Sequence, residues 1–225
     1  GADSLECMLR KIGLDDSEFT PAGGRGKVHL FTGTGGTPRF AASLNGGAAF
    51  TDATTLWDSV DHLRPYDIVF LSCEGGQNAG TKPDTAVQAM YDYANLGGRV
   101  FMSHWHNYWM MEGPDPWPVT ATWDFQNDPP SPFRGLINET FPKGQAFSEW
   151  MVNVQGSVVP GEIQINAAQH TVATVDETLT TRWIYSEAPE VPGVQYFTYN
   201  TPLTVPEEEQ CGRVVYTDIH VSSGD

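Results

Sequence analysis

The stretch Gly98-Arg99-Val100-Phe101-Met102-Ser103-His104-Trp105-His106-Asn107-Tyr108-Trp109 holds the strongest fold and site signals in the chain. Its apolar start predicts a short strand over Val100–Met102, and the strand runs directly into a polar and aromatic cluster. Side chains two positions apart in an extended chain point to the same face. We therefore expect the imidazoles of His104 and His106 to converge, with the Trp105 side chain on the opposite face.

The segments around this stretch alternate between strand and helix patterns. Upstream, Ile68–Leu71 is a continuous apolar run, typical of a strand that is buried on both faces of a parallel sheet. Apolar residues at helical spacing follow Pro83 as far as Leu96, and Gly97-Gly98 ends that helix. Near the C-terminus, Arg213–Thr217 predicts the last core strand. This order predicts an α/β fold with a doubly wound, mostly parallel sheet.

Other segments complete the expected architecture as a single domain over residues 1–225. Helices are predicted over Leu5–Ile12, Asp52–Leu63 and Gly144–Val154, and a further strand over Val28–Thr32. The strands Gly161–Ile165, Arg182–Tyr185 and Val194–Tyr199 predict an antiparallel extension of the sheet. Before these strands lies a long insertion over residues 110–140 that is rich in proline and tryptophan. Such a composition is found in functional lids and in packed surface loops alike.

The composition excludes several classes of partner. Twelve basic residues against 28 acidic residues give a net charge of −16. Such a chain lacks the basic surface that nucleic acids require. It also lacks an apolar run of the ~18 residues that a membrane span needs. The glycine-rich segment Gly33–Pro38 has no Walker lysine and predicts a surface loop rather than a phosphate site.

The acidic balance, the low lysine content and the many Gly, Thr, Asn and Trp residues are typical of an exported protein. We expect a secreted, periplasmic or cell-surface location, with the chain as part of a longer exported polypeptide. One disulfide, Cys7–Cys211, is then expected, with Cys73 free; three reduced thiols are the alternative.

Reactive residue types follow three of the predicted strands. Cys73 and Glu74 follow the first, Ser103 and His104 the second, and Asp218 and His220 the last. Ligands of open parallel sheets bind beyond the carboxyl ends of the strands. The sequence therefore predicts a functional site at this edge of the sheet.

The residues of these strands also carry a family resemblance. The segments Tyr66–Phe70, Gly97–Phe101 and Gly212–Thr217 resemble the class I glutamine amidotransferase-like superfamily, and in particular its trehalose-utilization (ThuA-like) branch. The resemblance implies a flavodoxin-like sheet and a carbohydrate-related function, with His220 at the position of the family histidine. The position of the family's nucleophilic cysteine carries Ser103-His104, and Val221-Ser222 replaces Pro-Glu, which argues against glutaminase chemistry.

Three functions remain open at this stage. The first is a zinc or copper site bound by His104, His106 and His220, with Asp218 or Glu74 as a further ligand, that catalyses hydrolysis. The second is a metal-free hydrolase in which Cys73 or Ser103 is the nucleophile, a histidine such as His220 the base, and Glu74 or Asp218 the orienting carboxylate.

The third function is a non-catalytic domain that recognises a small molecule, a glycan or a peptide. Aromatic side chains near the predicted pocket would supply the binding surface. These residues are Trp105, Tyr108, Trp109 and Trp117.

Overall fold

A computed structural model describes residues 3, 5–125, 128–188 and 192–220 of the chain. Its centre is a seven-stranded sheet with the strand order β5-β6-β13-β12-β11-β8-β9. The strands of this sheet are β5 (Ile68–Leu71), β6 (Arg99–Ser103), β8 (Phe133–Ile137), β9 (Glu162–Ile165), β11 (Thr181–Ser186), β12 (Gly193–Thr201) and β13 (Gly212–Thr217). The predicted α/β class is confirmed.

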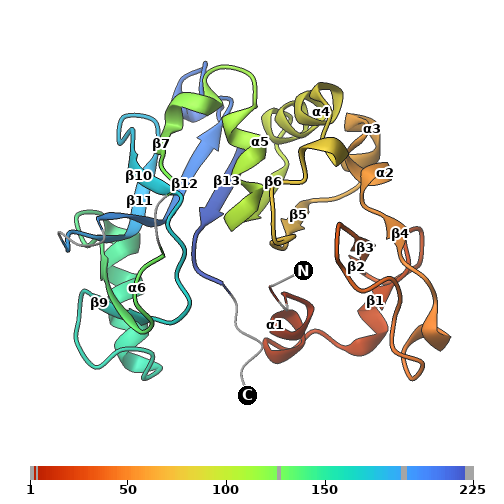
Figure 1. Cartoon of the computed structure of the whole chain (residues 1–225), viewed down its shortest axis with the longest axis horizontal. Helices are drawn as coiled ribbons and strands as arrows, with labels where there is room; N and C mark the ends of the chain where they lie inside the picture. The colour runs from red at the N-terminus through yellow and green to blue at the C-terminus, as the bar shows by residue number, and fades with distance from the viewer. Residues whose placement is uncertain (1–2, 4, 126–127, 189–191, 221–225) are drawn as a thin grey trace.

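The sheet has a parallel part and an antiparallel part. β6 pairs in parallel with β5 on one side and with β13 on the other. The pairings from β13 through β12, β11 and β8 to β9 are all antiparallel. The predicted antiparallel extension is therefore present. In Figure 1, β5, β6 and β13 lie near the middle of the molecule, and α6 (Pro142–Asn153) lies beside β9 at the far end.

Short helices cover one face of the parallel part. They are α2 (Thr54–Trp57), α3 (Val60–Leu63), α4 (Asp84–Asn95) and α5 (Tyr108–Met111). Buried side chains of these helices pack on alternate strand residues, including Leu71, Met102 and Tyr216. This alternation is the expected period of two in a strand.

Two predicted elements differ in the structure. The helix expected over Asp52–Leu63 is divided into α2 and α3, because Ser59 is extended (φ −153°) and caps α3 through its hydroxyl. β5 was expected to be buried on both faces, but Ile68 and Phe70 are 46% and 41% exposed. The helices pack on the face that carries Val69 and Leu71, which leaves the opposite face of β5 exposed.

The N-terminal region forms small elements outside the central sheet. They are α1 (Leu5–Lys11), β1 (Phe19–Thr20), β2 (Val28–His29), β3 (Phe31–Thr32) and β4 (Thr51–Asp52). The predicted strand Val28–Thr32 is thus divided between two two-stranded sheets, β1–β2 and β3–β4. In Figure 1, α1 lies below the ends of the parallel strands.

The insertion over residues 110–140 is more ordered than a loop. It contains β7 (Ala121–Trp123), which pairs antiparallel with β10 (Val172–Val175), and the sheet strand β8. The sequence did not indicate β7, β8 or β10. On α6, Trp150 was expected to face inward, but it is 55% exposed. Among the described residues, no helix is both long and apolar enough to cross a membrane.

Candidate functional site

Three parallel strands deliver one reactive side chain each to the same edge of the sheet. Leu71 of β5 lies opposite Met102 of β6, and Ser103 lies opposite Thr217 of β13. The carboxyl ends of the three strands are therefore level. Cys73, His104 and His220 follow these ends, and their side chains meet there.

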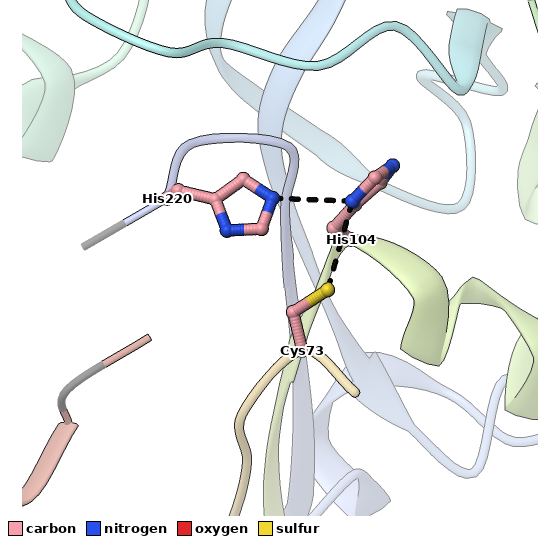
Figure 2. A group of neighbouring side chains, drawn as sticks. All are labelled: Cys73, His104 and His220. Carbon is pink, nitrogen blue, oxygen red and sulfur yellow. Dashed lines mark hydrogen bonds between the residues drawn. The ribbon is translucent and has the colours of Figure 1, made fainter. Parts of the chain in front are cut away.

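The three side chains form a compact donor cluster, the Cys73–His104–His220 cluster (Figure 2). His220 Nε2 lies 3.1 Å from His104 Nδ1, and Cys73 Sγ lies 3.7 Å from the same His104 Nδ1. All three atoms lie within 4.8 Å of one another. This separation is compatible with a single metal ion bound by one sulfur and two nitrogen atoms.

The local backbone explains why His104 belongs to the cluster and His106 does not. β6 ends at Ser103, and residues His104–Asn107 form a 3-10 helix in place of extended chain. His104 itself has a left-handed conformation, with φ of 42°. The Tyr216 hydroxyl lies 2.8 Å from the His104 carbonyl and shares its one proton between this carbonyl and the Asp218 carboxylate, which holds this turn. The expectation of a shared face for His104 and His106 is therefore wrong.

His106 is a structural residue, which corrects its prediction as a metal ligand. Its Nδ1 accepts a hydrogen bond from Trp109 Nε1 at 3.0 Å, so its Nε2 carries the proton and donates to the Ser72 carbonyl at 2.8 Å. Burial lowers the pKa of His106 to about 4. Both ring nitrogens are occupied, and the ring is neutral at pH 7.

Asp218 is also excluded from the cluster, although it was predicted as a ligand. The carboxylate is fully buried and accepts hydrogen bonds from the Thr171 amide at 2.9 Å, the Thr171 hydroxyl at 2.7 Å and the Tyr216 hydroxyl at 2.7 Å. Burial raises the pKa of Asp218, and these donors oppose the rise. The carboxylate thus joins β13 to the segment before β10.

Cys73 is a buried thiol with two backbone donors near its sulfur. The Gly75 amide donates to Sγ at 3.4 Å, and the Trp105 amide also lowers the pKa of Cys73. Burial has the larger effect and raises this pKa, and the negative charges of Asp3 and Glu74 raise it further. Burial and His220 lower the pKa of His104 to about 4. Without a cation, the cluster therefore consists of a thiol and a neutral His104 ring.

Ser103 and Glu74, two predicted catalytic residues, have other partners. The Ser103 hydroxyl donates to the Asp3 carboxylate in a very short hydrogen bond, not to a histidine. Glu74 forms a buried ion pair with Lys82 at 2.5 Å and accepts the Thr34 amide at 2.8 Å. Neither residue is arranged as the nucleophile or the orienting carboxylate of a Ser-His-Asp triad.

The predicted aromatic rim is only partly present. Trp109 and Trp117 have no exposed surface and belong to the main core, which corrects their prediction as ligand-binding residues. Tyr108 is half-buried and packs against that core. Trp105 is half-buried, with its ring centroid 4.6 Å from that of His104, and lies parallel to the 48% exposed Phe125. Phe125 was not identified from the sequence.

Asp3 is the residue at this site that sequence reasoning missed. Its carboxylate lies 3.0 Å from His220 Nδ1, although the two residues are 217 positions apart. In the sequence Asp3 has the position of a helix cap before Leu5, and no local pattern relates it to His220. Only the tertiary fold brings it into contact with the strand ends.

Two of the three donor–donor distances in the cluster are close to those of zinc coordination. With Zn–N about 2.0–2.1 Å and Zn–S about 2.3 Å, a tetrahedral ion separates its donor atoms by about 3.3–3.6 Å. The observed separations of 3.1 Å and 3.7 Å lie close to these values. One sulfur and two imidazoles are also a donor set that copper accepts.

Comparisons with known proteins assign no family. No family model matches the chain, and no curated protein matches it. Among solved structures, the chain is similar to a cytoplasmic protein, STM3548, from Salmonella typhimurium, with 14% sequence identity and a TM-score of 0.46. The match covers 78% of this chain and 70% of that chain. A likeness at this level carries no argument about function.

The prediction of an exported protein is corrected here. This neighbour is named as a cytoplasmic protein, in contrast to the secreted, periplasmic or cell-surface location predicted for the chain, and that location is not proposed again. The expected disulfide is also absent from the described residues, since Cys7 and Cys211 are exposed free thiols and Cys73 is a buried one. No location is assigned to the chain.

Proposed function

We propose that this protein is a metal-dependent hydrolase whose single ion is bound by Cys73 Sγ, His104 Nδ1 and His220 Nε2. Zinc is the first choice of ion and copper the second. The observation that carries the proposal is the position of His104 Nδ1, which is in contact with both other donor atoms. Three donor atoms that share one small volume are arranged for a common partner.

The same observation argues against a metal-free Cys-His hydrolase. In a nucleophile–base–carboxylate relay, the base uses one ring nitrogen for the nucleophile and the other for the orienting group. Here the two contacts of the His104 ring involve the same nitrogen. His220 has a carboxylate, that of Asp3, at its Nδ1, but its Nε2 contacts His104 Nδ1 at 3.1 Å. The Cys73 thiol also has a raised pKa, whereas a nucleophilic cysteine requires a lowered one.

Three protein ligands favour catalysis over a purely structural metal. Structural zinc sites are closed by four protein ligands, whereas catalytic sites keep one position for water or substrate. An ion in an open site lowers the pKa of its bound water and supplies a nucleophile for hydrolysis. The two backbone N–H groups that point to Cys73 Sγ would stabilise its thiolate form.

We also propose that the fold is flavodoxin-like and that the chain is related to the amidotransferase-like superfamily through its ThuA-like branch. Several features support this relation. Gly97-Gly98 lies between α4 and β6, β13 pairs in parallel with β6, and His220 follows β13 at the site. The left-handed turn at His104 follows β6, where that superfamily has its nucleophile.

Recognition of a glycan, a peptide or a small molecule without catalysis is the second candidate. The observation that favours it is the stacked pair of Trp105 and Phe125 next to His104, because exposed aromatic rings bind sugar and apolar groups. The two candidates share this surface. They differ in whether the bound ligand is converted.

Metal-dependent turnover distinguishes the two candidates. Purified protein would be treated with a chelator, reconstituted with zinc or copper, and assayed with p-nitrophenyl esters, phosphates and glycosides. We expect activity that is lost with the chelator, restored by the metal and absent in His220→Ala, whereas the exposed control His62→Ala retains it. Metal-loaded protein that turns over none of these substrates but shows quenched tryptophan fluorescence with a glycan or peptide would favour the second candidate.

A further inference from the structure

Asp3 connects all three strand ends that carry the cluster. Its side chain is 1% exposed, and its Oδ1 lies 3.0 Å from His220 Nδ1. Oδ2 accepts the Cys73 amide at 3.2 Å and the Ser103 hydroxyl. The Asp3 carbonyl also accepts the Ser72 hydroxyl at 2.9 Å.

These contacts orient two of the three donor atoms. A carboxylate accepts hydrogen bonds, so His220 donates from Nδ1 to Asp3, and Nε2 is the ring nitrogen that faces His104. The bond to the Cys73 amide fixes the turn after β5 from which Sγ projects. One carboxylate therefore holds together the segments that follow β5 and β13 and the last residue of β6.

The Asp3 carboxylate also adds a buried negative charge beside the cluster. A fixed negative charge next to the donor atoms attracts a divalent ion more strongly than a monovalent one.

We propose that Asp3 is the positioning residue of the metal centre and that its charge selects a divalent ion over a monovalent one. This inference rests on the proposed metal function, which it deepens. Loss of an outer hydrogen-bond partner lowers metal affinity about 10–100-fold. The electrostatic part of that loss scales with the charge of the ion, so it acts more strongly on Zn²⁺ than on Cu⁺.

The test uses competition with chromophoric chelators to measure the affinities of the intact protein for Zn²⁺ and for Cu⁺ under anaerobic conditions. Asp3→Asn removes the charge and keeps the shape. We expect its zinc affinity to fall about 10–100-fold and its Cu⁺ affinity to fall about 3–10-fold. The control Asp61→Asn, at an exposed carboxylate whose partner is Arg64 at 3.5 Å, should retain both affinities.

The outcomes separate this inference from the proposed function. Wild-type protein that binds neither ion contradicts the metal function itself. If wild-type protein binds zinc, then an Asp3→Asn variant with unchanged zinc affinity, or with an equal loss for both ions, overturns the role of Asp3. Should Asp3→Asn fail to fold, Asp3→Glu is the second variant, because it keeps the charge and displaces the oxygen atoms. It should lower the affinities for Zn²⁺ and Cu⁺ by the same factor. Affinities equal to those of the wild type would overturn the positioning role.

Discussion

His104 and His106 are two positions apart in the chain, but their rings have different surroundings. His104 Nδ1 faces the sulfur of Cys73 and the ring of His220. His106 is bonded at both nitrogens to groups of the protein core. The difference arises from one left-handed residue, since φ of 42° at His104 turns the chain out of the strand.

His106→Ala tests this division of roles. The substitution leaves the Ser72 carbonyl and the Trp109 N–H without their partner and creates a cavity. We expect a loss of about 2–5 kcal/mol in the free energy of unfolding, measured by urea denaturation. The folded variant should keep its metal stoichiometry. A folded variant without metal would show that His106 is a ligand after all.

Asp218→Asn provides a second test at the scale of the residue. The three groups that face the carboxylate are all donors, and an asparagine replaces one of its acceptor oxygens with a further donor. We expect the variant to be about 1–3 kcal/mol less stable and to bind metal as the wild type does. Unchanged stability together with weakened metal binding would contradict the structural role of Asp218.

At the scale of elements, the buried ion pair between Glu74 and Lys82 fixes the turn after β5. Lys82 has no exposed side-chain surface, and its ammonium also donates to the Gln77 carbonyl at 2.9 Å. Glu74 reaches across to the Thr34 amide in the glycine-rich loop. A Cβ at Gly33 would lie 2.2 Å from Glu74 Oε1, so a larger residue there would displace the Glu74 carboxylate from its present position.

Lys82→Met should be strongly destabilising, because it leaves the Glu74 carboxylate buried without a counter-charge. We expect a loss of about 3–5 kcal/mol, whereas the exposed pair of Arg10 and Asp16 should contribute at most about 1 kcal/mol. The double variant Glu74→Gln/Lys82→Met should recover part of the loss. Urea denaturation of the wild type, the single variants Glu74→Gln and Lys82→Met, and the double variant measures these differences, and additive losses would rule out a coupled pair.

Local patterns in the sequence were sufficient for the strands and helices near the site. The predicted strand Ile68–Leu71 agrees with β5, and the helix from Pro83 to Leu96 lies within one residue of α4 at either end. α4 buries residues at the helical spacing that the prediction used, whereas β5 buries only one of the two faces that were expected to be buried. The division of Asp52–Leu63 was missed because the cap at Ser59 lies within an otherwise helical pattern.

The candidate site was predicted only in part. Cys73, His104 and His220 were identified because each follows an apolar strand, and parallel strands end at a common edge. Asp3 was not identified, since its contact with His220 depends on how the N-terminal segment returns to the sheet. The partners of His106 and Asp218 were not visible either, because hydrogen bonding inside a core leaves no periodic signal.

At the scale of the whole molecule, metal binding should be coupled to proton release. The Cys73 thiol has a raised pKa and is protonated at pH 7 before the metal binds, whereas His104 is already neutral. We therefore expect at least one proton to be released per ion, and metal affinity to increase with pH. Calorimetry in buffers of different ionisation enthalpy measures this number. Binding without proton release would exclude Cys73 as a thiolate ligand.

The thiols of the whole chain offer an independent check on the cluster. Three free cysteines are present, of which Cys7 and Cys211 are exposed and Cys73 is buried. A thiol reagent should find three thiols in denatured protein and two that react rapidly in metal-loaded native protein. If denatured protein shows only one thiol, two of the cysteines form a disulfide, which would contradict the three free thiols of the structure.

The metal content of the purified protein tests the central claim most directly. Protein prepared without a histidine tag would be measured by mass spectrometry as isolated and after reconstitution with zinc or copper. We predict close to one ion per chain in the wild type and in His62→Ala, and little or none in His104→Ala and His220→Ala. A reconstituted wild type that carries no metal would contradict the proposed metal site, as would full metal content in the two cluster variants.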